Sequence, residues 1–559
     1  MSLRELGERV DNYGSITTPL LDRVVDLDDD SDGIKRIGED GASEVEGKSG
    51  GRRQIGVVSA IFIIFNRMIG TGIFATPSTI LIHSGSVGMS LIMWLVGAVI
   101  AAVGMQVYIT WGTASPQNGG EKNYLEYVFR KPRHLMTSVY ATITVLLGWS
   151  IGNSLVFGEY LLKALGIEPS RWILRFVALA CLTFAMLIHG TALKWGLRLQ
   201  NFLGMFKMIL ILIVVGTGFV ALSGHMQIEK PHNFENIFEG TTTNASSLCF
   251  ALYNVLWSFI GFSNVNYALA EVKNPARTIR IAGPFAIVVV TVLYMLANIA
   301  YFAGASKEEI TGSGRLVAAL LFRNVYGRQT ERLLDSFVAL CALGNVLAVI
   351  FSLGRVNQEL GREGILPFSK LWASNRPFNA PLAGLALRES QYTLRRAHGD
   401  MTDEIFVLMP DWAACIVPMF ALPPGDAYNF VLNVTSYPLS VINAAISFGI
   451  IYLSRWRPYA DWPHVGTGAQ LSAAAFGLAN IFLFIVPLMR PPPNGEPYEH
   501  LPYWSHAVGG WAVFGLGFLY WLVWAVVLPF IGNYGWMKTE ETGSDGLVRH
   551  IWEAPKFVF

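Results

Sequence analysis

Long apolar stretches recur along this 559-residue chain, and they constrain its fold more than any other feature. A helix needs about 20 consecutive apolar residues to cross the hydrocarbon core of a bilayer, and about 12 stretches meet that criterion. They lie at residues 55–81, 86–113, 136–164, 170–190, 196–224, 247–270, 281–304, 332–354, 405–422, 427–453, 466–489 and 506–533. The sequence therefore predicts an all-α polytopic membrane protein with about 12 transmembrane helices.

The composition agrees with this prediction and excludes several classes of protein. The chain is 52% hydrophobic and only 14% charged, whereas a soluble domain carries roughly 25% charged residues. The net charge of +1 offers no basic surplus for nucleic acid. The four cysteines lie in apolar stretches without disulfide or metal-ligand spacing, so we expect buried small hydrophobes, no metal and no cofactor. They are Cys181, Cys249, Cys341 and Cys415.

The two tails and the basic residues predict how the chain is oriented. Residues 1–54 are polar and locally acidic, which predicts a disordered tail, and residues 534–559 form a second tail. Lys and Arg gather in alternate short loops, which places both termini in the cytoplasm, with the plasma membrane as the expected location. Those residues are Lys122, Arg130, Lys131, Arg133, Lys194, Arg198, Lys273, Arg277, Arg280, Arg355, Arg362, Lys370, Arg376, Arg455 and Arg457. The loop after 281–304 breaks the pattern with Lys307, Arg315, Arg323 and Arg328.

Two spans carry residues that interrupt helices. The first contains Gly70-Thr71-Gly72 and Pro77, and the sixth contains the polar patch Ser258–Asn264. A close-packing face is one interpretation, because small residues are common where membrane helices touch. Interrupted spans at matching places in two halves are also the best sequence indication of a transporter's central site. We therefore predict a five-plus-five inverted repeat with broken helices 1 and 6, covering about 55–224 and 247–453, followed by two helices within 466–533.

Such breaks suit a zwitterionic substrate. Freed amides around Thr71 and Gly72 lie at a positive helix end and can hold a carboxylate. Freed carbonyls of Met68 and Ile69, and of residues 257–260, can accept from an ammonium group. The aromatic residues there favour an apolar or thioether side chain, although plain packing is the alternative for each. The predicted substrate-binding residues are Met68, Ile69, Gly70, Thr71, Gly72, Trp257, Phe259, Ile260, Gly261 and Phe262.

Charged residues inside the predicted spans are a second functional signal. Lys207 lies within the fifth span and Arg67 directly precedes the glycines of the first. Such a charge costs roughly 2.5–3.5 kcal/mol or more, so it usually has a partner or a task. Lys207 either extends to the cytoplasmic surface or acts as an amine that replaces a cation or carries a proton. Arg67 is expected to pair with Glu271, as an inner gate or as a structural ion pair.

Several motifs resemble the amino acid–polyamine–organocation superfamily and its L-type amino acid transporter family. They run in order over most of the chain, and the nearest resemblance is to fungal high-affinity methionine permeases. The motifs are Asn66-Arg67-Met68-Ile69-Gly70-Thr71-Gly72-Ile73-Phe74, Gly119-Gly120-Glu121-Lys122-Asn123-Tyr124, residues 261–277, Gly361-Arg362-Glu363-Gly364-Ile365-Leu366-Pro367 and Pro423-Pro424-Gly425-Asp426-Ala427-Tyr428-Asn429-Phe430.

The resemblance implies a LeuT-type fold of twelve helices, with the substrate carboxylate on the Thr71 and Gly72 amides. It also places Lys207 where sodium-coupled relatives bind sodium, which implies proton coupling or exchange. This chain has Phe262-Ser263 where the family has Trp-Asn, and Ala270 where it has a first glutamate. A polar insert at 388–404 does not fit the family, and we interpret it as a retained intron or a wrong gene model.

The predicted function is secondary active transport of a neutral amino acid by alternating access, with proton-coupled uptake of methionine as the specific hypothesis. An exchanger and a nutrient receptor on the same fold are alternatives. An enzyme is disfavoured because His189, the one histidine near a span interior, has no acidic partner nearby. Expected partners are the amino acid, protons, membrane lipid and a ubiquitin-ligase adaptor at the acidic tail with Lys35 and Lys48. No disulfide-linked heavy chain is expected, because no cysteine falls in an outer loop.

Overall fold

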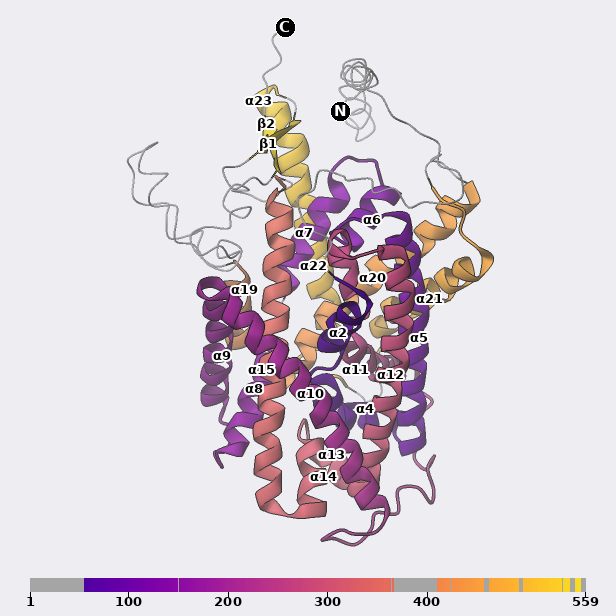
Figure 1. The fold of residues 1–559 in the computed structure, drawn as a ribbon, viewed down its shortest axis with the longest axis vertical. Coiled ribbons are helices and arrows are strands. Elements are labelled where there is room, and N and C mark those ends of the chain that lie inside the picture. The colour runs from indigo at the N-terminus through magenta and orange to yellow at the C-terminus, as the bar shows by residue number, and fades with distance from the viewer. Residues whose placement is uncertain are drawn as a thin grey trace.

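The computed structural model describes most of the chain from Ile55 onward (Figure 1). The described residues are 55–148, 150–362, 364–365, 410–423, 425–456, 462–491, 496–534, 536–542 and 548–553. The predicted acidic tail 1–54 and the polar insert 388–404 lie outside these residues.

Within those ranges, 11 helices or broken helices are long and apolar enough to cross a membrane, one fewer than the 12 expected. They cover Val57–Ala75, Val87–Ala114, Leu135–Ala164, Arg171–His189, Lys194–Leu222, Ala245–Glu271, Pro275–Gly304, Arg328–Gly354, Asp426–Trp456, Thr467–Leu488 and Ser505–Gly532. The missing one is the ninth expected span, 405–422, which is described only from Pro410 as the 12-residue helix α19. The prediction of an all-α polytopic membrane protein is confirmed.

The first five spans comprise nine helices, and the first span is broken into three of them. They are α2 (Val57–Met68), α3 (Gly72–Ala75), α4 (Pro77–Ser84), α5 (Val87–Ala114), α6 (Glu121–Val128), α7 (Leu135–Leu147), α8 (Ile151–Ala164), α9 (Arg171–Thr191) and α10 (Leu193–Leu222). Local sequence sets these boundaries. Pro77 opens α4 because proline suits the first helical position, and Gly85 ends it at a φ of 77°.

The next spans begin with a second broken helix. Their elements are α11 (Ala245–Phe259), η1 (Asn264–Glu271), α12 (Pro275–Gly304), α13 (Lys307–Gly312), α14 (Val317–Tyr326), α15 (Arg328–Arg362), α19 (Pro410–Ala421) and α20 (Asp426–Trp456). Asn244 caps α11 by accepting from the amides of Ser246 and Ser247. Ser306 and Glu309 form a capping box on α13.

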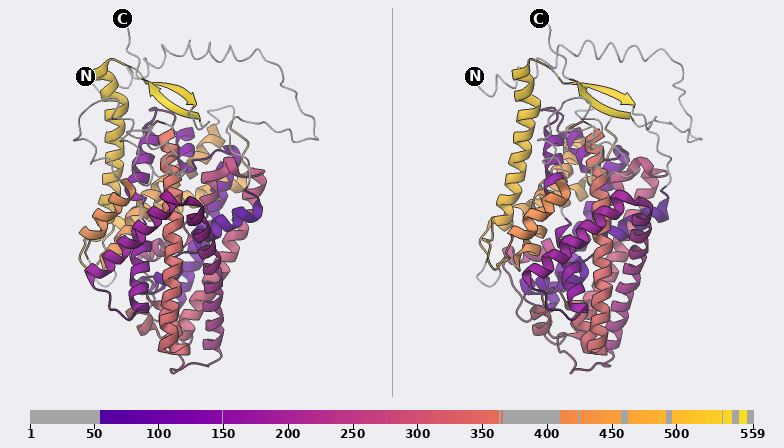
Figure 2. Two further views of the ribbon diagram at one scale, coloured as in Figure 1. Left: turned by 60° about the vertical axis from the view of Figure 1, so that its left-hand side comes forward. Right: turned by 90° about the vertical axis from the view of Figure 1, so that its left-hand side faces the viewer.

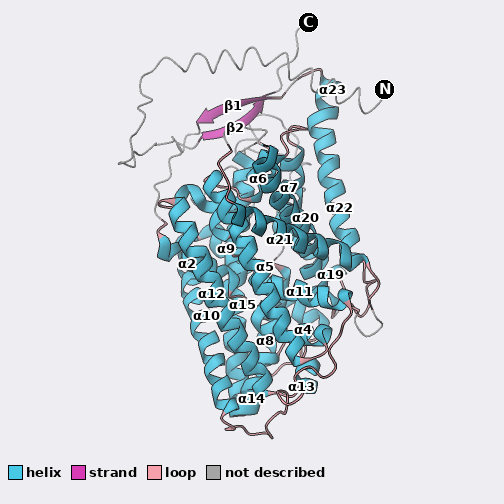
Figure 3. Cartoon of the chain, turned by 90° about the vertical axis from the view of Figure 1, so that its right-hand side faces the viewer, coloured by secondary structure: helices cyan, strands magenta, loops and turns pink. Residues whose placement is uncertain are grey.

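The last elements are α21 (Thr467–Ile485), η2 (Val486–Leu488), α22 (Ser505–Trp521), the π-helical turn η3 (Leu522–Val527), α23 (Leu528–Gly532) and two strands, β1 (Met537–Thr542) and β2 (Val548–Glu553). The strands pair antiparallel, with Met537 opposite Glu553. They are the exception to the all-α prediction, and they lie beyond the last span at the α6 end of the bundle (Figures 2 and 3).

Corresponding helices of the two halves pack against each other. The third span packs against the eighth (α8 with α15), the second against the seventh (α5 with α12), and the first against the sixth (α3 with α11). This like-with-like packing is the arrangement expected of an inverted repeat, whose substrate site lies at the interface of the repeats. Figure 1 shows α2 and α11 near the middle of the bundle, with α13 and α14 at the end opposite α6.

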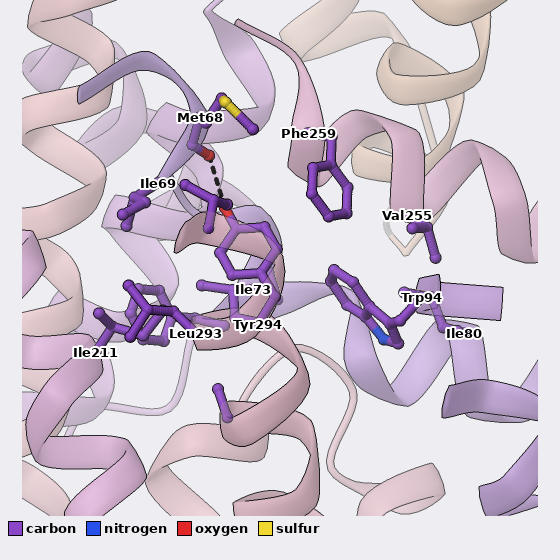
Figure 4. Close-up of a cluster of buried hydrophobic side chains, with 14 of the residues drawn as sticks. Met68, Ile69, Ile73, Ile80, Trp94, Ile211, Val255, Phe259, Leu293 and Tyr294 are labelled. Atoms are coloured by element: carbon purple, nitrogen blue, oxygen red, sulfur yellow. Dashed lines mark hydrogen bonds between the residues drawn. The ribbon is translucent and has the colours of Figure 1, made fainter. Parts of the chain in front are cut away.

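A buried aromatic cluster fixes α5, α11 and α12 beside the breaks (Figure 4). The Trp94 and Tyr294 rings meet edge to face at 5.5 Å, and Phe259 packs on Tyr294 at 5.2 Å. Aromatic pairs at such distances contribute about 0.5–1.5 kcal/mol beyond the area that they bury. The cluster therefore holds the helices that carry the predicted site in a fixed relation.

Candidate substrate site

The first span is interrupted where its glycines predict. Helix α2 ends at Met68, and α3 begins at Gly72. Among the described atoms, the amides of Gly70, Thr71 and Gly72 donate to no backbone carbonyl. A Cβ on Gly72 would lie 2.4 Å from Ser258 Oγ, so only glycine allows α3 and α11 to come this close. The break thus leaves three free donors at the interface of the two halves.

The sixth span is interrupted beside the first. Helix α11 ends at Phe259, η1 begins at Asn264, and Gly261 between them has a φ of +121°. A Cβ on Gly261 would lie 2.3 Å from Cγ of Arg67, so both the backbone conformation and the contact require glycine. The two breaks therefore touch, as the prediction of matched broken helices requires.

A tyrosine of the seventh span joins the two breaks. The Tyr294 hydroxyl lies 2.7 Å from the carbonyl oxygen of Met68 and 3.0 Å from that of Ser258, and Figure 4 shows the first contact. A hydroxyl has one hydrogen, so it donates to one carbonyl at a time. Tyr294 thus satisfies carbonyls that the breaks expose, and the Met68 carbonyl is already engaged.

A small cavity of about 30 Å³ lies between the breaks. Such a volume holds about one or two water molecules, so an amino acid requires the surrounding helices to move apart. The cavity is lined by Arg67, Met68, Gly70, Thr71, Gly72, Asn153, Trp257, Ser258, Ile260, Asn345 and Val349.

Seven of the predicted substrate or gating residues line this cavity, but four substrate candidates do not. Phe259 packs in the Trp94–Tyr294 cluster, and Phe262 meets the Tyr108 ring at 5.6 Å. Ile69 and Gly261 also lie outside the lining. Phe259 is still part of α11 and lies about 200° around the helix from Trp257, whereas Phe262 lies beyond the end of α11. In this conformation Trp257 is the only predicted aromatic residue at the cavity.

Lys207 on α10 is buried beside the first break, so it does not extend to the surface. Its Nζ lies 3.1 Å from each of three acceptors: the Asn66 carbonyl oxygen, Asn66 Oδ1 and Asn345 Oδ1. An ammonium group has three hydrogens and no lone pair, so these acceptors match its charged form. Lys207 is 1% exposed and holds α10, α2 and α15 together.

Two asparagines connect Lys207 to the first break. Asn345 Nδ2 donates to Asn153 Oδ1 at 3.3 Å, and Thr71 Oγ1 donates to the same oxygen at 2.7 Å. Neither asparagine was predicted from the sequence. The available signal was their polarity within apolar spans, which is a functional indication in a membrane protein.

The third span is also interrupted, which the expected continuous stretch 136–164 did not predict. Helix α7 ends at Leu147 and α8 begins at Ile151. Asn153 lies in the first turn of α8, and a Cβ on Gly152 would be 3.7 Å from Trp257 Cζ2. The N-terminal end of α8 therefore lies beside the cavity.

Arg67 and Glu271 do not form the expected ion pair in this structure. Glu271 is exposed at the end of η1, where its carbonyl accepts from Ile55 N at 3.0 Å. Arg67 instead lies against Gly261 and interacts electrostatically with Tyr267. Arg67 lines the cavity, whereas Glu271 does not.

The α13–α14 side of the site is closed by a charged cluster. Arg315 Nε donates to Glu159 Oε2 at 2.6 Å, and its guanidinium lies 5.4 Å from the centre of the Tyr428 ring. Tyr428 is 2% exposed and packs beside Gly152. Since Glu159 comes from the third span, Arg315 from the loop after the seventh and Tyr428 from the tenth, this cluster ties the two halves together.

The α6 side is closed by a buried carboxylate. Glu121 accepts from the hydroxyls of Tyr108 at 2.5 Å, Tyr267 at 2.9 Å and Tyr140 at 3.3 Å. Burial raises the pKa of Glu121 above its usual value, and the tyrosine hydrogen bonds act in the opposite direction. Tyr267 belongs to η1 and the other partners to the first half, so Glu121 ties the halves on this side.

These features define a secondary transporter: broken helices meet at a central cavity, and separate ties close each side. Amino acid permeases share this architecture. A family model described as "Amino acid permease" matches residues 55–389, more than half of the chain. The chain belongs to the amino acid permease family, and it is a transporter rather than an enzyme.

Several curated proteins are similar in sequence. The high-affinity methionine permease of Saccharomyces cerevisiae is 45% identical over 505 residues, covering 89% of this chain and 84% of that protein. The low-affinity methionine permease of the same yeast is 30% identical, covering 98% and 95%. The b(0,+)-type amino acid transporter 1 of Mus musculus is 31% identical over 56% of this chain and 63% of its own length. The predicted resemblance to this family is confirmed.

Proposed function

We propose that this permease takes up methionine, or a similar apolar or thioether amino acid, together with a proton. The substrate carboxylate accepts hydrogen bonds from the free amides of Gly70, Thr71 and Gly72, and the substrate ammonium group donates to carbonyls of the sixth-span break. Alternating access then moves the two halves about this fixed site.

The proposal of proton coupling rests on the surroundings of Lys207. Three acceptors meet its Nζ, two of them from Asn66 in the last turn before the break. A buried lysine that loses its proton leaves one of these acceptors without a donor, so its charge state and the position of α2 depend on each other. That dependence is what a proton-coupled carrier requires.

The methionine preference is supported by two relatives whose names carry that amino acid. The cavity lining is compatible, because Trp257, Ile260 and Val349 offer apolar surface and no carboxylate lines the cavity. A thioether side chain makes favourable contacts with an aromatic ring.

We propose the orientation that the sequence predicts, with the α6 end cytoplasmic, and the plasma membrane as the location. The one exception in the sequence was the basic loop after the seventh span. Arg315 of that loop is paired with Glu159 at 2.6 Å, and Arg323 lies 3.7 Å from Glu309. These pairings give both arginines an acidic partner, but acidic residues contribute little to the positive-inside rule, so the loop stays an exception to it. Binding of a ubiquitin-ligase adaptor to the tail 1–54 stays a prediction outside the described residues.

Amino acid exchange is the second candidate. A human relative named as a cystine/glutamate transporter is 30% identical over 56% of this chain, and its name carries two amino acids. An exchanger would use the same breaks, but it would need an amino acid on the opposite side for every transport cycle. A receptor without flux is the third possibility from the sequence.

The test is uptake of radiolabelled methionine in yeast cells that lack methionine permeases, over a range of external pH. We expect uptake to rise at acid pH, to collapse with an uncoupler and to fail in Lys207→Met. Lys194→Met is the matched control, because Lys194 is exposed near the start of the same helix. Uptake by Lys207→Met that keeps the wild-type pH dependence would contradict proton coupling through this lysine, and binding without flux would favour the receptor.

A further inference from the structure

The charge on Lys207 fixes the direction of a hydrogen-bond chain that ends in the cavity. An ammonium group only donates, so Asn345 must present its oxygen to Lys207 and its Nδ2 to Asn153. Asn153 must then present its oxygen to Asn345, and the Thr71 hydroxyl donates to that same oxygen. These donors therefore fix which side-chain atom is the oxygen and which is the nitrogen in both asparagines.

This chain of hydrogen bonds leaves the Asn153 Nδ2 group with two unused hydrogens. No acceptor for it is found among the residues that the structure describes, although Asn153 is only 4% exposed and lines the cavity. Asn153 Nδ2 is not one of the fully buried atoms that lack a partner, so a molecule in the cavity can reach it and supply the acceptor.

The backbone around Asn153 favours a negatively charged ligand. Asn153 lies in the first turn of α8, a 14-residue helix that begins inside the third span. Ser150, which precedes the helix, makes no side-chain cap to its amides. The uncapped N-terminal end of a helix attracts anions. Gly70, Thr71 and Gly72, which carry the free amides of the first-span break, line the same cavity.

From this geometry we propose that Asn153 is a specificity-determining residue that donates a hydrogen bond to the substrate carboxylate, and that Asn345 positions it. The inference rests on the proposed transport of an amino acid and assigns a third helix to carboxylate recognition. Ligands with an ammonium group but no oxygen in place of the carboxylate bind more weakly because they offer Asn153 no acceptor.

The test compares L-methionine with its decarboxylated amine, 3-(methylthio)propylamine, in which a hydrogen replaces the carboxylate and no oxygen remains to accept from Asn153. Apparent dissociation constants of both ligands are measured from their stabilisation of the purified full-length protein against heat. We expect Asn153→Ala to weaken methionine binding by roughly 10- to 100-fold, the value of a hydrogen bond to a charged group. Binding of the amine should change by less than about threefold, so the discrimination between the two ligands falls.

Three further variants separate this role from a structural one. Asn153→Asp should reject methionine more strongly than Asn153→Ala, since a second carboxylate repels the first. Asn345→Ala should give an intermediate loss, and it serves if the Asn153 variants fail to fold. Asn298→Ala is the control, because Asn298 is buried but donates only to Tyr294 O in its own helix.

The outcomes distinguish the two proposals. Equal weakening of both ligands by Asn153→Ala, or unchanged discrimination in both the Asn153 and Asn345 variants, would overturn this inference alone. A wild-type protein that binds no amino acid would overturn the proposed function and this inference with it.

Discussion

Adding one methyl group at Gly72 should separate the two broken helices. In Gly72→Ala the new Cβ would lie 2.4 Å from Ser258 Oγ and 2.8 Å from the Cα and Cβ of Ser258. The hydroxyl can rotate away, but the Cα belongs to the backbone of α11. Helix α3 or α11 must therefore shift by about 0.6–1.2 Å to restore ordinary contact.

Overpacking of this kind costs about 1–3 kcal/mol. If the cost falls on the closed arrangement of the site, methionine affinity drops by about 5- to 150-fold, because each 1.4 kcal/mol is a factor of ten. Ser258→Ala in the same chain should not rescue the variant, since it removes Oγ and leaves the backbone contact.

The assay pairs methionine uptake per surface molecule with the thermal unfolding midpoint of the purified protein. Gly216→Ala is the control, because no heavy atom lies within 4 Å of a Cβ built on Gly216 in the same transmembrane bundle. We expect Gly216→Ala to behave as wild type or to be slightly more stable. Wild-type uptake and stability in Gly72→Ala would refute the close approach of α3 and α11.

Three more predictions concern residues around the site. Tyr294→Phe removes the hydroxyl that reaches the carbonyls of Met68 and Ser258, so the unfolding free energy should fall by about 1–2 kcal/mol, measured as a lower unfolding midpoint; an unchanged midpoint would contradict this role. Asp426→Asn should lower the unfolding free energy by about 1.5–3 kcal/mol, because the carboxylate accepts from three loop amides at 2.7–3.1 Å. A loss of this size in Asp426→Ala, with no loss in Asp426→Asn, would show that the charge is unimportant. Burial raises the pKa of Glu121, so the stability that its protonation contributes is complete below about 4.5 and is lost as pH rises through the higher folded-state pKa. Wild type should therefore lose stability relative to Glu121→Gln as pH rises from about 4.5, and a constant difference in unfolding midpoint would refute this.

The spans and two of the breaks follow from the sequence because their signals are local. About 20 apolar residues predict a crossing wherever they occur. The glycines at 70 and 72 interrupt the first span because the chain has no side chain there to block its neighbour. The position of Lys207 within an apolar stretch likewise predicts burial or a task.

The parts that escaped prediction depend on contacts between distant segments. Asn153 and Asn345 are 192 positions apart, and only the packing of α8 against α15 brings them together. The expected pairing of Arg67 with Glu271 rested on proximity in the predicted topology, but the exit of the sixth span turns Glu271 outward. Phe259 faces the core rather than the cavity because it lies two residues after Trp257 in the same helix, about 200° around the helix axis.

The most direct test of the account uses purified protein in liposomes that contain no amino acid. An acidic exterior is imposed, and the accumulation of radiolabelled methionine is followed with and without an ionophore that collapses the pH gradient. We expect accumulation above equilibrium that requires the gradient and is absent in Lys207→Met. Accumulation that instead requires an amino acid inside the liposomes, or that persists in Lys207→Met, would contradict proton-coupled uptake through this site.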